Sequence, residues 1–297
     1  MKVVVFGAGN FGKKWCCESA DDAEVVAVID NNSQKWGGVL CGHKILEPSE
    51  LKNLSYDKVI VAVDDFPDEG RKNLSEILRQ LSDYGVKHSD IFLPTYRFSA
   101  GYPHDPRIDF LRKYSSIVQE HNISGAVAEC GVWRGSFAGQ INKLFPDRKL
   151  YLFDTFGDGF DQRDLDKEPE HLLKTPTYEA LNEWGVHADA TVSLLRCPYP
   201  ENVIIKSGYV PETFQGLEDE KFAFVNLDMD LYQPQIEALR FFAPRMEQGG
   251  IILVHEYYHT GYVSVKAAVD DFAKEFPVAL LPTEDSLSVA VVPLSKK

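Results

Sequence analysis

The chain has 297 residues, of which 44% are hydrophobic and 12% aromatic, so it can build packed cores and is not expected to be disordered. Its 31 basic and 45 acidic residues give a formal charge of −14, which argues against nucleic acid and anionic membranes as partners. No apolar run approaches the roughly 18 residues that a membrane-spanning helix needs. Because the N-terminus also lacks a signal-peptide layout, we expect a cytoplasmic protein.

The five cysteines are odd in number and include no C-x-x-C pair, and the adjacent Cys16 and Cys17 lack the spacing of a zinc site. In a cytosolic protein the thiols are kept reduced. The sequence therefore predicts reduced, mostly buried thiols at Cys16, Cys17, Cys41, Cys130 and Cys197.

The first segment, residues 1–95, alternates apolar strand-like runs with helical stretches. This alternation predicts a parallel sheet covered by helices, that is, a small Rossmann-like α/β domain. We expect strands at Lys2–Phe6, Glu24–Ile29, Lys58–Val63 and Asp90–Leu93, and helices at Asn10–Ser19 and Asp68–Tyr84.

A glycine motif, GAGNFG, follows the first expected strand and places Gly7, Gly9 and Gly12 at the start of a helix. Glycines there let the backbone approach a pyrophosphate, and Asp30 at the end of the next strand is placed to hold a ribose. The segment is short for a complete dinucleotide domain. Two interpretations stay open: nucleotide or nucleotide-sugar binding, and a fold used for packing or oligomerisation. No acid–base pattern in the second domain supports a nicotinamide-dependent oxidoreductase.

Residues 96–106 are rich in proline, glycine and aromatic residues without periodicity, which predicts a linker. An amphipathic helix near Ile108–His121 opens the second domain, residues 107–297. We expect strands at Ala126–Cys130, Lys149–Phe153, Asn202–Lys206, Phe222–Leu227 and Ile251–Val254, then a hairpin of Val278–Leu281 and Ser288–Val292. The fold class that this predicts is α/β, with a seven-stranded sheet ending in an antiparallel hairpin.

A second glycine turn lies in AVAECGVWRGSFA, where a strand ends in Glu129 and Gly131 and Gly135 bracket the turn. The next strand ends in Asp154, and an acidic residue there suits the ribose of an adenosine cofactor. A single turn without G-x-G-x-x-G suits a ligand that lacks a pyrophosphate. The pattern favours S-adenosylmethionine over NAD; the alternative is a structural turn without a ligand.

Titratable side chains follow two later strands, with Asp228 and Asp230 after one and His255 and Glu256 after the other. Ligands of open α/β sheets bind at the carboxyl ends of the strands, so these four groups predict a metal site, a general-base site, or both. HEYYH, ending at His259, matches the zincin pattern in letters only, because that chemistry needs both histidines on one helix and this segment follows a strand.

Six motifs in order, ECGVWRGSFA, LYLFDTFGDGF, KSGYVPETF, LDMDLYQP, PRMEQGGIILVHEYY and VKAAVDDF, resemble the macrocin/mycinamicin/novobiocin-type (TylF-like) sugar O-methyltransferase family. The resemblance covers residues 107–297 and implies a class I S-adenosylmethionine-dependent O-methyltransferase that acts on a sugar or nucleotide-sugar hydroxyl. The first segment, through VVAVIDNN, KWGG, G-x-K-I and YDKVIVAV, resembles the small N-terminal domain of sugar acyltransferases.

By this resemblance, Glu129, Gly131 and Asp154 contact the methionine and ribose parts of the cofactor, and Ser207 and Gly208 lie beside its adenine. The complete cofactor-binding set that we predict is Glu129, Gly131, Trp133, Gly135, Ser136, Asp154, Thr155, Phe156, Ser207, Gly208 and Asp228.

The family also binds a divalent metal through the first Asp of D-x-D and a later Asp-Asp pair, and it uses the second Asp as base. Those positions are Asp228 and Asp230, but His255 and Glu256 stand where Asp-Asp is usual. One interpretation is a Mg²⁺ or Mn²⁺ site of Asp228, His255 and Glu256. The other is a site without metal, in which His255 is a base or a hydrogen-bond donor. For Asp230, the alternative to a base is a cap on the helix near Pro234.

The polar stretch 161–184 predicts either a solvated insertion or a lid over the site, since methyl transfer benefits from excluding water. The expected partner is a sugar or nucleotide-sugar acceptor, in a homo-oligomeric protein. The rival to an enzyme is a catalytically inactive scaffold with a methyltransferase fold, which the departure at His255 and Glu256 keeps open.

Overall fold

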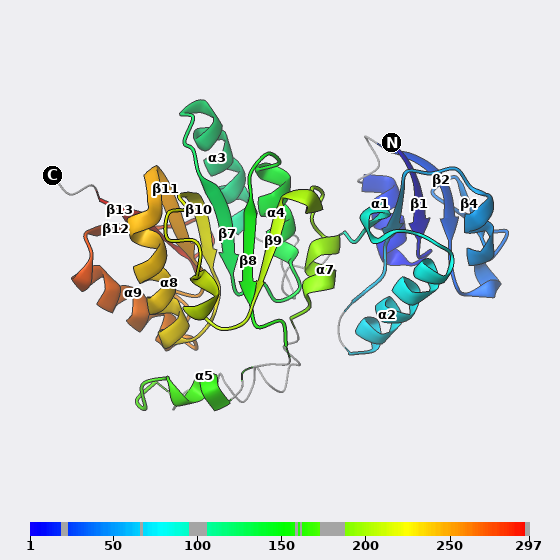
Figure 1. Ribbon diagram of the computed structural model, residues 1–297. Coiled ribbons are helices and arrows are strands. Elements are labelled where there is room, and N and C mark those ends of the chain that lie inside the picture. Colours follow the sequence, from blue (N-terminus) through cyan, green and yellow to red (C-terminus); the bar gives the residue numbers. More distant parts are fainter. Residues whose placement is uncertain are drawn as a thin grey trace. The chain divides into compact units, whose positions relative to one another are not determined.

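Two separate β-sheets organise the chain, one in each of the units Met1–Arg97 and Phe98–Lys297 (Figure 1). The structure is a computed structural model that describes residues 1–18, 23–65, 68–94, 106–157, 160, 162–172 and 188–294. Residues 96–105 of the expected linker and 173–184 of the expected insertion lie outside the described residues.

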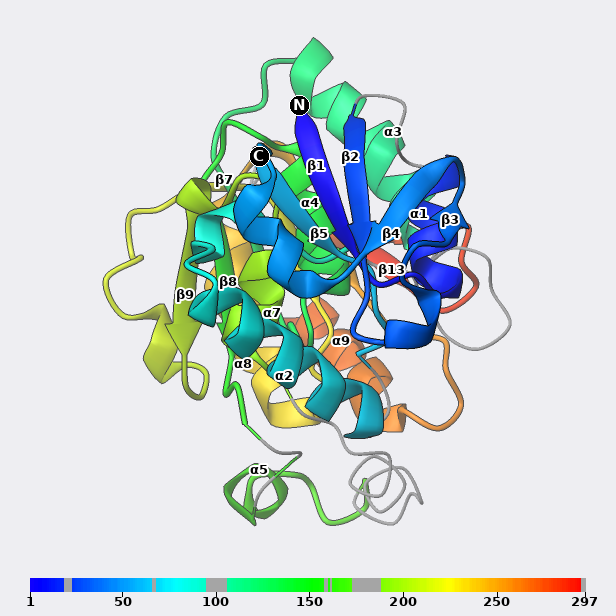
Figure 2. The same ribbon diagram turned by 90° about the vertical axis from the view of Figure 1, so that its right-hand side faces the viewer.

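The first unit has a six-stranded sheet in the order β3-β4-β2-β1-β5-β6, in which all neighbours are parallel except β3 and β4 (Figure 2). The strands are β1 Lys2–Phe6, β2 Glu24–Ile29, β3 Val39–Leu40, β4 His43–Leu46, β5 Lys58–Val61 and β6 Ile91–Phe92, and the helices are α1 Asn10–Glu18 and α2 Asp68–Asp83. The expected parallel, helix-covered sheet is confirmed, and Trp15 of α1 packs with Val3, Val5 and Val28 of the sheet in its core. Strands β3 and β4 were not expected, because two and four residues are too few to show an alternating pattern.

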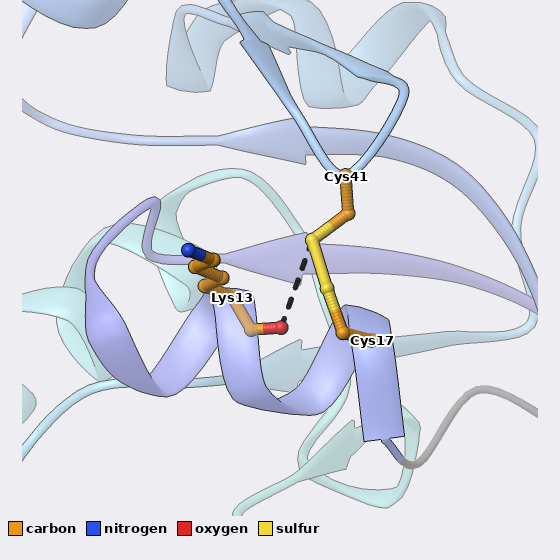
Figure 3. Close-up of a disulfide and its surroundings, with 3 residues drawn as sticks. All are labelled: Lys13, Cys17 and Cys41. Atoms are coloured by element: carbon orange, nitrogen blue, oxygen red, sulfur yellow. Dashed lines mark hydrogen bonds between the residues drawn. A yellow bond between two sulfur atoms is a disulfide. The ribbon is translucent and has the colours of Figure 1, made fainter.

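The expectation of five reduced cysteines is wrong for two of them. Cys17 at the end of α1 and Cys41 in the turn between β3 and β4 form a disulfide with their Cα atoms 6.5 Å apart (Figure 3). The pairing depends on the β3–β4 hairpin, which brings Cys41 over α1 and which the sequence did not reveal. Cys16, Cys130 and Cys197 are free thiols.

The second unit has a seven-stranded sheet in the order β12-β13-β11-β10-β7-β8-β9. The strands are β7 Ala126–Cys130, β8 Leu150–Asp154, β9 Val203–Ser207, β10 Phe222–Leu227, β11 Met246–Val254, β12 Val278–Pro282 and β13 Val289–Pro293. The first five are parallel, and β13 is antiparallel to both β11 and β12, so the expected seven-stranded sheet with a terminal hairpin is confirmed. The chain leaves β7 toward β8 on one side and returns to β10 on the other, which makes the carboxyl ends of β7 and β10 the topological switch point.

Helices cover both faces of this sheet (Figure 1). The helices described in this unit are α3 Arg107–Glu120, α4 Ser136–Leu144, α5 Gln162–Asp166, α7 Ala190–Leu195, α8 Tyr232–Phe242 and α9 Val263–Glu275, of which α5 lies away from the sheet. Leu111 of α3 and Ile141 of α4 pack on one side of the sheet, and Phe242 of α8 and Phe272 of α9 pack on the other. Among the described residues, no helix is both long and apolar enough to cross a membrane.

Candidate active site

Four non-glycine residues with left-handed backbone mark the loops at the carboxyl ends of the central strands. They are Trp133 after β7, Phe156 after β8, Asp230 after β10 and Glu256 after β11, with φ between 50° and 63°. This conformation is costly for side chains with a Cβ and is kept only where the surroundings impose it. Its recurrence in four neighbouring loops identifies this edge of the sheet as a candidate site.

Asp154, at the end of β8, ties the two loops of the expected cofactor site together. Its Oδ2 accepts the backbone N–H groups of Val132 at 2.7 Å and Trp133 at 2.9 Å. Its Oδ1 accepts the N–H of Phe156 at 3.0 Å and, at 3.5 Å, the hydroxyl of Thr155. The carboxylate therefore shapes the loop that it was expected to share with a ribose, and the ribose contact stays a prediction.

Glu129 is buried at the end of β7 with one carboxyl oxygen unused. Its Oε1 accepts a hydrogen bond from Asn226 Nδ2 at 3.0 Å, whereas Oε2 has no partner among the described residues. Burial, and after it the charge of Asp228, raise the pKa of Glu129 well above its usual value. A buried polar atom without a partner calls for a ligand that supplies one, so Glu129 fits the amino group of an amino acid such as the methionine part of S-adenosylmethionine.

Gly131 is required by close packing at the switch point. A Cβ at this position would lie 1.9 Å from the carbonyl oxygen of Asp228, and the glycine has a φ of 80°. The N–H of Asp228 in turn donates to the carbonyl of Cys130 at 2.8 Å. The turn after β7 thus lies directly against the residue that follows β10, and Gly131 has a structural role in bringing the two loops together.

The remaining expected cofactor residues lie in the same loops. Gly135 is the N-cap residue of α4, and Ser136 is the first residue of that helix. After β9, Gly208 N donates to the carbonyl of Asp154 at 2.9 Å, and the Ser207 hydroxyl lies 3.4 Å from the carbonyl of Thr155. The structure therefore brings the expected cofactor set together along one edge of the sheet.

An ion pair holds Asp228 on the other side of the switch point. Nη1 of Arg107, the first residue of α3, lies 2.8 Å from Asp228 Oδ2, and the guanidinium stacks over the Phe137 ring with 4.7 Å between Cζ and the ring centroid. Burial alone would raise the pKa of Asp228, but the charges of His255 and Arg107 hold that pKa below its usual value.

Both ring nitrogens of His255 face hydrogen-bonding groups. Nδ1 lies 3.0 Å from Ser288 Oγ, and that hydroxyl donates to Asp285, so the histidine is the donor to Ser288. Nε2 lies 3.1 Å from Glu256 Oε1. Burial would lower the pKa of His255, but the nearby carboxylates, first Asp228 and then Glu256, raise it overall. The arrangement favours an imidazolium.

Asp230 does not cap the helix that follows it. The N-cap residue of α8 is Leu231, and the first N–H groups of the helix, those of Tyr232 and Gln233, donate to the carboxylate of Glu168 at 3.0 and 2.9 Å. Among the described residues, none donates a hydrogen bond to Asp230. Burial, and then the charges of Asp228 and Glu256, raise the pKa of Asp230 well above its usual value.

The three expected metal ligands, Asp228, His255 and Glu256, are engaged with other side chains. In the part of the chain that the structure describes, no three His, Cys, Asp or Glu side chains converge to hold an ion. The physical reason is local: the guanidinium of Arg107 stands at Asp228, and the two nitrogens of His255 face Ser288 and Glu256. These residues do not fit a divalent metal.

Several site residues were missed from the sequence. They are Arg107, Glu168, Asp285, Ser288 and Tyr262, whose hydroxyl pKa is raised by burial and by the charges of Asp230 and Glu256. Only Arg107 carried a signal, because a cation in the first turn of a helix opposes the helix dipole and needs a partner elsewhere.

In the first unit, the glycines of GAGNFG play different parts. A Cβ on Gly12 would lie 1.8 Å from the carbonyl oxygen of Gly7, so this glycine allows the helix to pack against the strand, whereas a Cβ on Gly9 would meet nothing within 4 Å. Asp30 Oδ2 accepts Ala8 N–H at 2.6 Å and Lys35 Nζ at 2.9 Å. The Asp30 carboxylate is thus already bonded inside the unit, and its ribose contact stays a prediction.

Comparison with known proteins agrees with this architecture. Residues 98–279 match the family model described as macrocin-O-methyltransferase (TylF), and residues 1–87 match the model described as C2185-like, N-terminal. The tetracenomycin 4'-O-methyltransferase of Streptomyces olivaceus, named for a 2,3-dimethoxy-α-L-rhamnosyl substrate, is 26% identical over 168 residues, which are 51% of this chain and 60% of the relative. The chain thus matches less than two thirds of that relative's length.

Among solved structures, the O-methyltransferase NovP superimposes with a TM-score of 0.53 at 22% identity, covering 64% of this chain and 80% of that chain. This likeness confirms the methyltransferase fold of the second unit. Since the family model spans more than half of the sequence, the resemblance found in the six motifs is confirmed: the chain belongs to the macrocin O-methyltransferase (TylF) family.

Proposed function

We propose that this protein is an S-adenosylmethionine-dependent O-methyltransferase that acts on a sugar hydroxyl, carried by a nucleotide sugar or a glycoconjugate. Family membership supports the reaction class. The curated relative's name, a methyltransferase of a rhamnosyl group, supports a sugar acceptor. The observation that carries the proposal is the state of two buried carboxylates at the switch point. Glu129 has an unused oxygen, and Asp230 receives no hydrogen bond from the described residues.

Glu129 and Asp154 are the residues that would hold the cofactor. The unused Oε2 of Glu129 would accept a hydrogen bond from the amino group, and Asp154 keeps the loop from Gly131 to Gly135 in place for the adenosine part. When bound, S-adenosylmethionine supplies a methyl group on a sulfonium sulfur, which is already electrophilic. The protein's main contribution is therefore to align the acceptor oxygen and remove its proton.

Asp230 is the base in this proposal. A sugar hydroxyl is a poor nucleophile until its proton is removed, and a carboxylate with a raised pKa is a better proton acceptor than an ordinary aspartate. The ring of His255, held by Ser288 and Glu256, would stabilise negative charge beside it. No step of this proposal uses a metal ion.

A methyl-transfer assay with a panel of sugar and nucleotide-sugar acceptors tests the proposal. We expect S-adenosylhomocysteine to form with at least one acceptor of the panel. A protein that binds the cofactor and methylates none of them would favour the alternative, an inactive scaffold with a methyltransferase fold.

As a second candidate activity, we propose that the GAGNFG turn of the first unit binds the diphosphate of a nucleotide or nucleotide sugar. The open space at Gly9 supports it, because this is the glycine at which a backbone approaches a pyrophosphate. Calorimetric titration of the full chain with UDP-, GDP- and dTDP-sugars tests it against Gly9→Leu, whose Cβ would meet no protein atom within 4 Å. Binding that Gly9→Leu abolishes would support the site; no binding by the wild type would favour a role in packing or in the homo-oligomer that we predict.

A further inference from the structure

Carboxylates lie on both sides of the second unit's switch point, and a guanidinium pairs with one of them. Glu129 lies near the end of β7, Asp228 and Asp230 follow β10, and Arg107, at the start of α3, pairs with Asp228. We propose that Arg107 is the fixed cation of this acceptor site, taking the place that a divalent metal ion holds in the wider family, so that the reaction needs no metal. This inference rests on the proposed function.

The Arg107–Asp228 pair has the geometry of a strong ion pair. Nη1 and Oδ2 are 2.8 Å apart, and the two side chains are only 11% and 24% exposed. Charged hydrogen bonds with little access to solvent are stronger than exposed ones. The guanidinium is also fixed in its plane by the Phe137 ring beneath it. A metal ion that used Oδ2 of Asp228 would have to displace this guanidinium.

The charge of Arg107 reaches groups on both sides of the site. On one side, burial raises the pKa of Glu129, and the positive charge of Arg107 opposes that rise. On the other side, the guanidinium pairs directly with Asp228 Oδ2 at 2.8 Å. One cation thus offsets part of the negative charge on the cofactor side and on the acceptor side, which is the electrostatic task of a metal at such a position.

The other two expected ligands are turned to different partners. His255 Nδ1 lies 3.0 Å from Ser288, which Asp285 fixes in turn through its hydroxyl and through its backbone N–H at 2.8 Å. The second nitrogen faces Glu256 Oε1 at 3.1 Å rather than open space. The ring therefore links β11 to the β12–β13 loop. Arg107 acts here through Asp228 and is a positioning residue.

The test combines Mn²⁺ binding, followed by electron paramagnetic resonance, with methyl transfer by the full chain in EDTA. We expect the wild type to bind Mn²⁺ no more tightly than millimolar and to keep its rate within twofold when EDTA replaces added Mg²⁺. We expect Arg107→Gln to lower kcat/KM about tenfold or more, as substitutions of orienting residues do, while cofactor affinity is retained. The variant should also gain Mn²⁺ binding, because Asp228 is released.

Arg112→Gln is the matched control, because Arg112 lies in the same helix, is largely exposed and pairs only locally with Asp109. It should match the wild type in every readout. Micromolar Mn²⁺ binding by the wild type that Asp228→Asn removes, or loss of methyl transfer in EDTA, would overturn the inference. The Mn²⁺ titration does not depend on turnover, so it can overturn the inference even if the proposed methyl transfer is not observed.

Discussion

Asn226 and Glu129 are direct neighbours on adjacent strands, and the Asn226 amide donates to Glu129 Oε1 at 3.0 Å inside the sheet of the second unit. Both side chains are buried, with 0% and 2% of their surface exposed. The amide leaves one carboxyl oxygen of Glu129 for a ligand and fixes the direction in which that oxygen points.

Replacing Asn226 by Leu should therefore affect both folding and cofactor binding. The change leaves a buried carboxyl group without its donor, which costs about 1–3 kcal/mol in the free energy of unfolding. We also expect the Kd for S-adenosylmethionine to rise at least about tenfold. Asn142→Leu is the control, since Asn142 is equally buried and bonds Tyr199 instead. Calorimetry showing equal cofactor affinity in the two variants would contradict the role of Glu129.

Asp230→Asn should retain cofactor binding and lose turnover. The amide cannot accept the acceptor's proton, and loss of a general base typically costs about 10²- to 10⁴-fold in rate. Single-turnover methyl transfer measures the chemical step, and calorimetry measures the cofactor Kd. The exposed Asp219→Asn should behave as wild type. Undiminished turnover in Asp230→Asn would remove Asp230 as the base.

Glu168→Ala should loosen the described part of the expected insertion. Glu168 accepts the N–H groups of Tyr232 and Gln233, so its removal takes the cap from α8 and costs about 1 kcal/mol of stability. We expect faster proteolytic cleavage between residues 162 and 172 and a higher KM for the acceptor. Glu170→Ala, at an exposed neighbour, is the control. Identical cleavage rates in the two variants would show that Glu168 does not anchor this segment.

Because Cys17 forms the disulfide and Cys16 does not, we expect substitutions of these adjacent cysteines to differ in their effect on stability. Cys17→Ser opens a cross-link between residues 24 apart in sequence, and the chain-entropy relation gives a loss of about 3 kcal/mol for a loop of this size. Cys16→Ser removes a free thiol and should have a much smaller effect. Thiol titration of the denatured, unreduced wild type should give three free thiols, because five cysteines less two in the disulfide leave three. A count of five would contradict the bond.

Much of the fold could be predicted from local patterns. Apolar runs such as Phe222–Leu227 are long enough to predict a buried strand. The polar residues that follow such runs lie at one edge of the sheet, because the carboxyl ends of parallel strands meet there. The two-residue strand Val39–Leu40 has no such signal. Because the hairpin that contains it was not predicted, the Cys17–Cys41 disulfide was not predicted either.

The site residues, too, were only partly predictable from the sequence. Glu129, Asp154, Asp228 and Asp230 were expected because each ends or follows a strand. Other site residues make contacts that are distant in sequence: Arg107 pairs with a residue 121 positions away, Glu168 with one 64 away, and Ser288 with one 33 away. The titratable groups at the strand ends and the family resemblance led us to expect a metal site, whereas the competing pair of Arg107 with Asp228 is a tertiary contact that was not predicted.

Calorimetric titration of the purified full chain with S-adenosylmethionine and S-adenosylhomocysteine, in EDTA and with NAD alongside, tests the central claim most directly. We expect micromolar binding of both adenosyl ligands without added metal and no binding of NAD. Absence of adenosyl binding, with or without Mg²⁺ or Mn²⁺, would contradict the proposed function and would mean that this member of the family has kept the fold without the cofactor site.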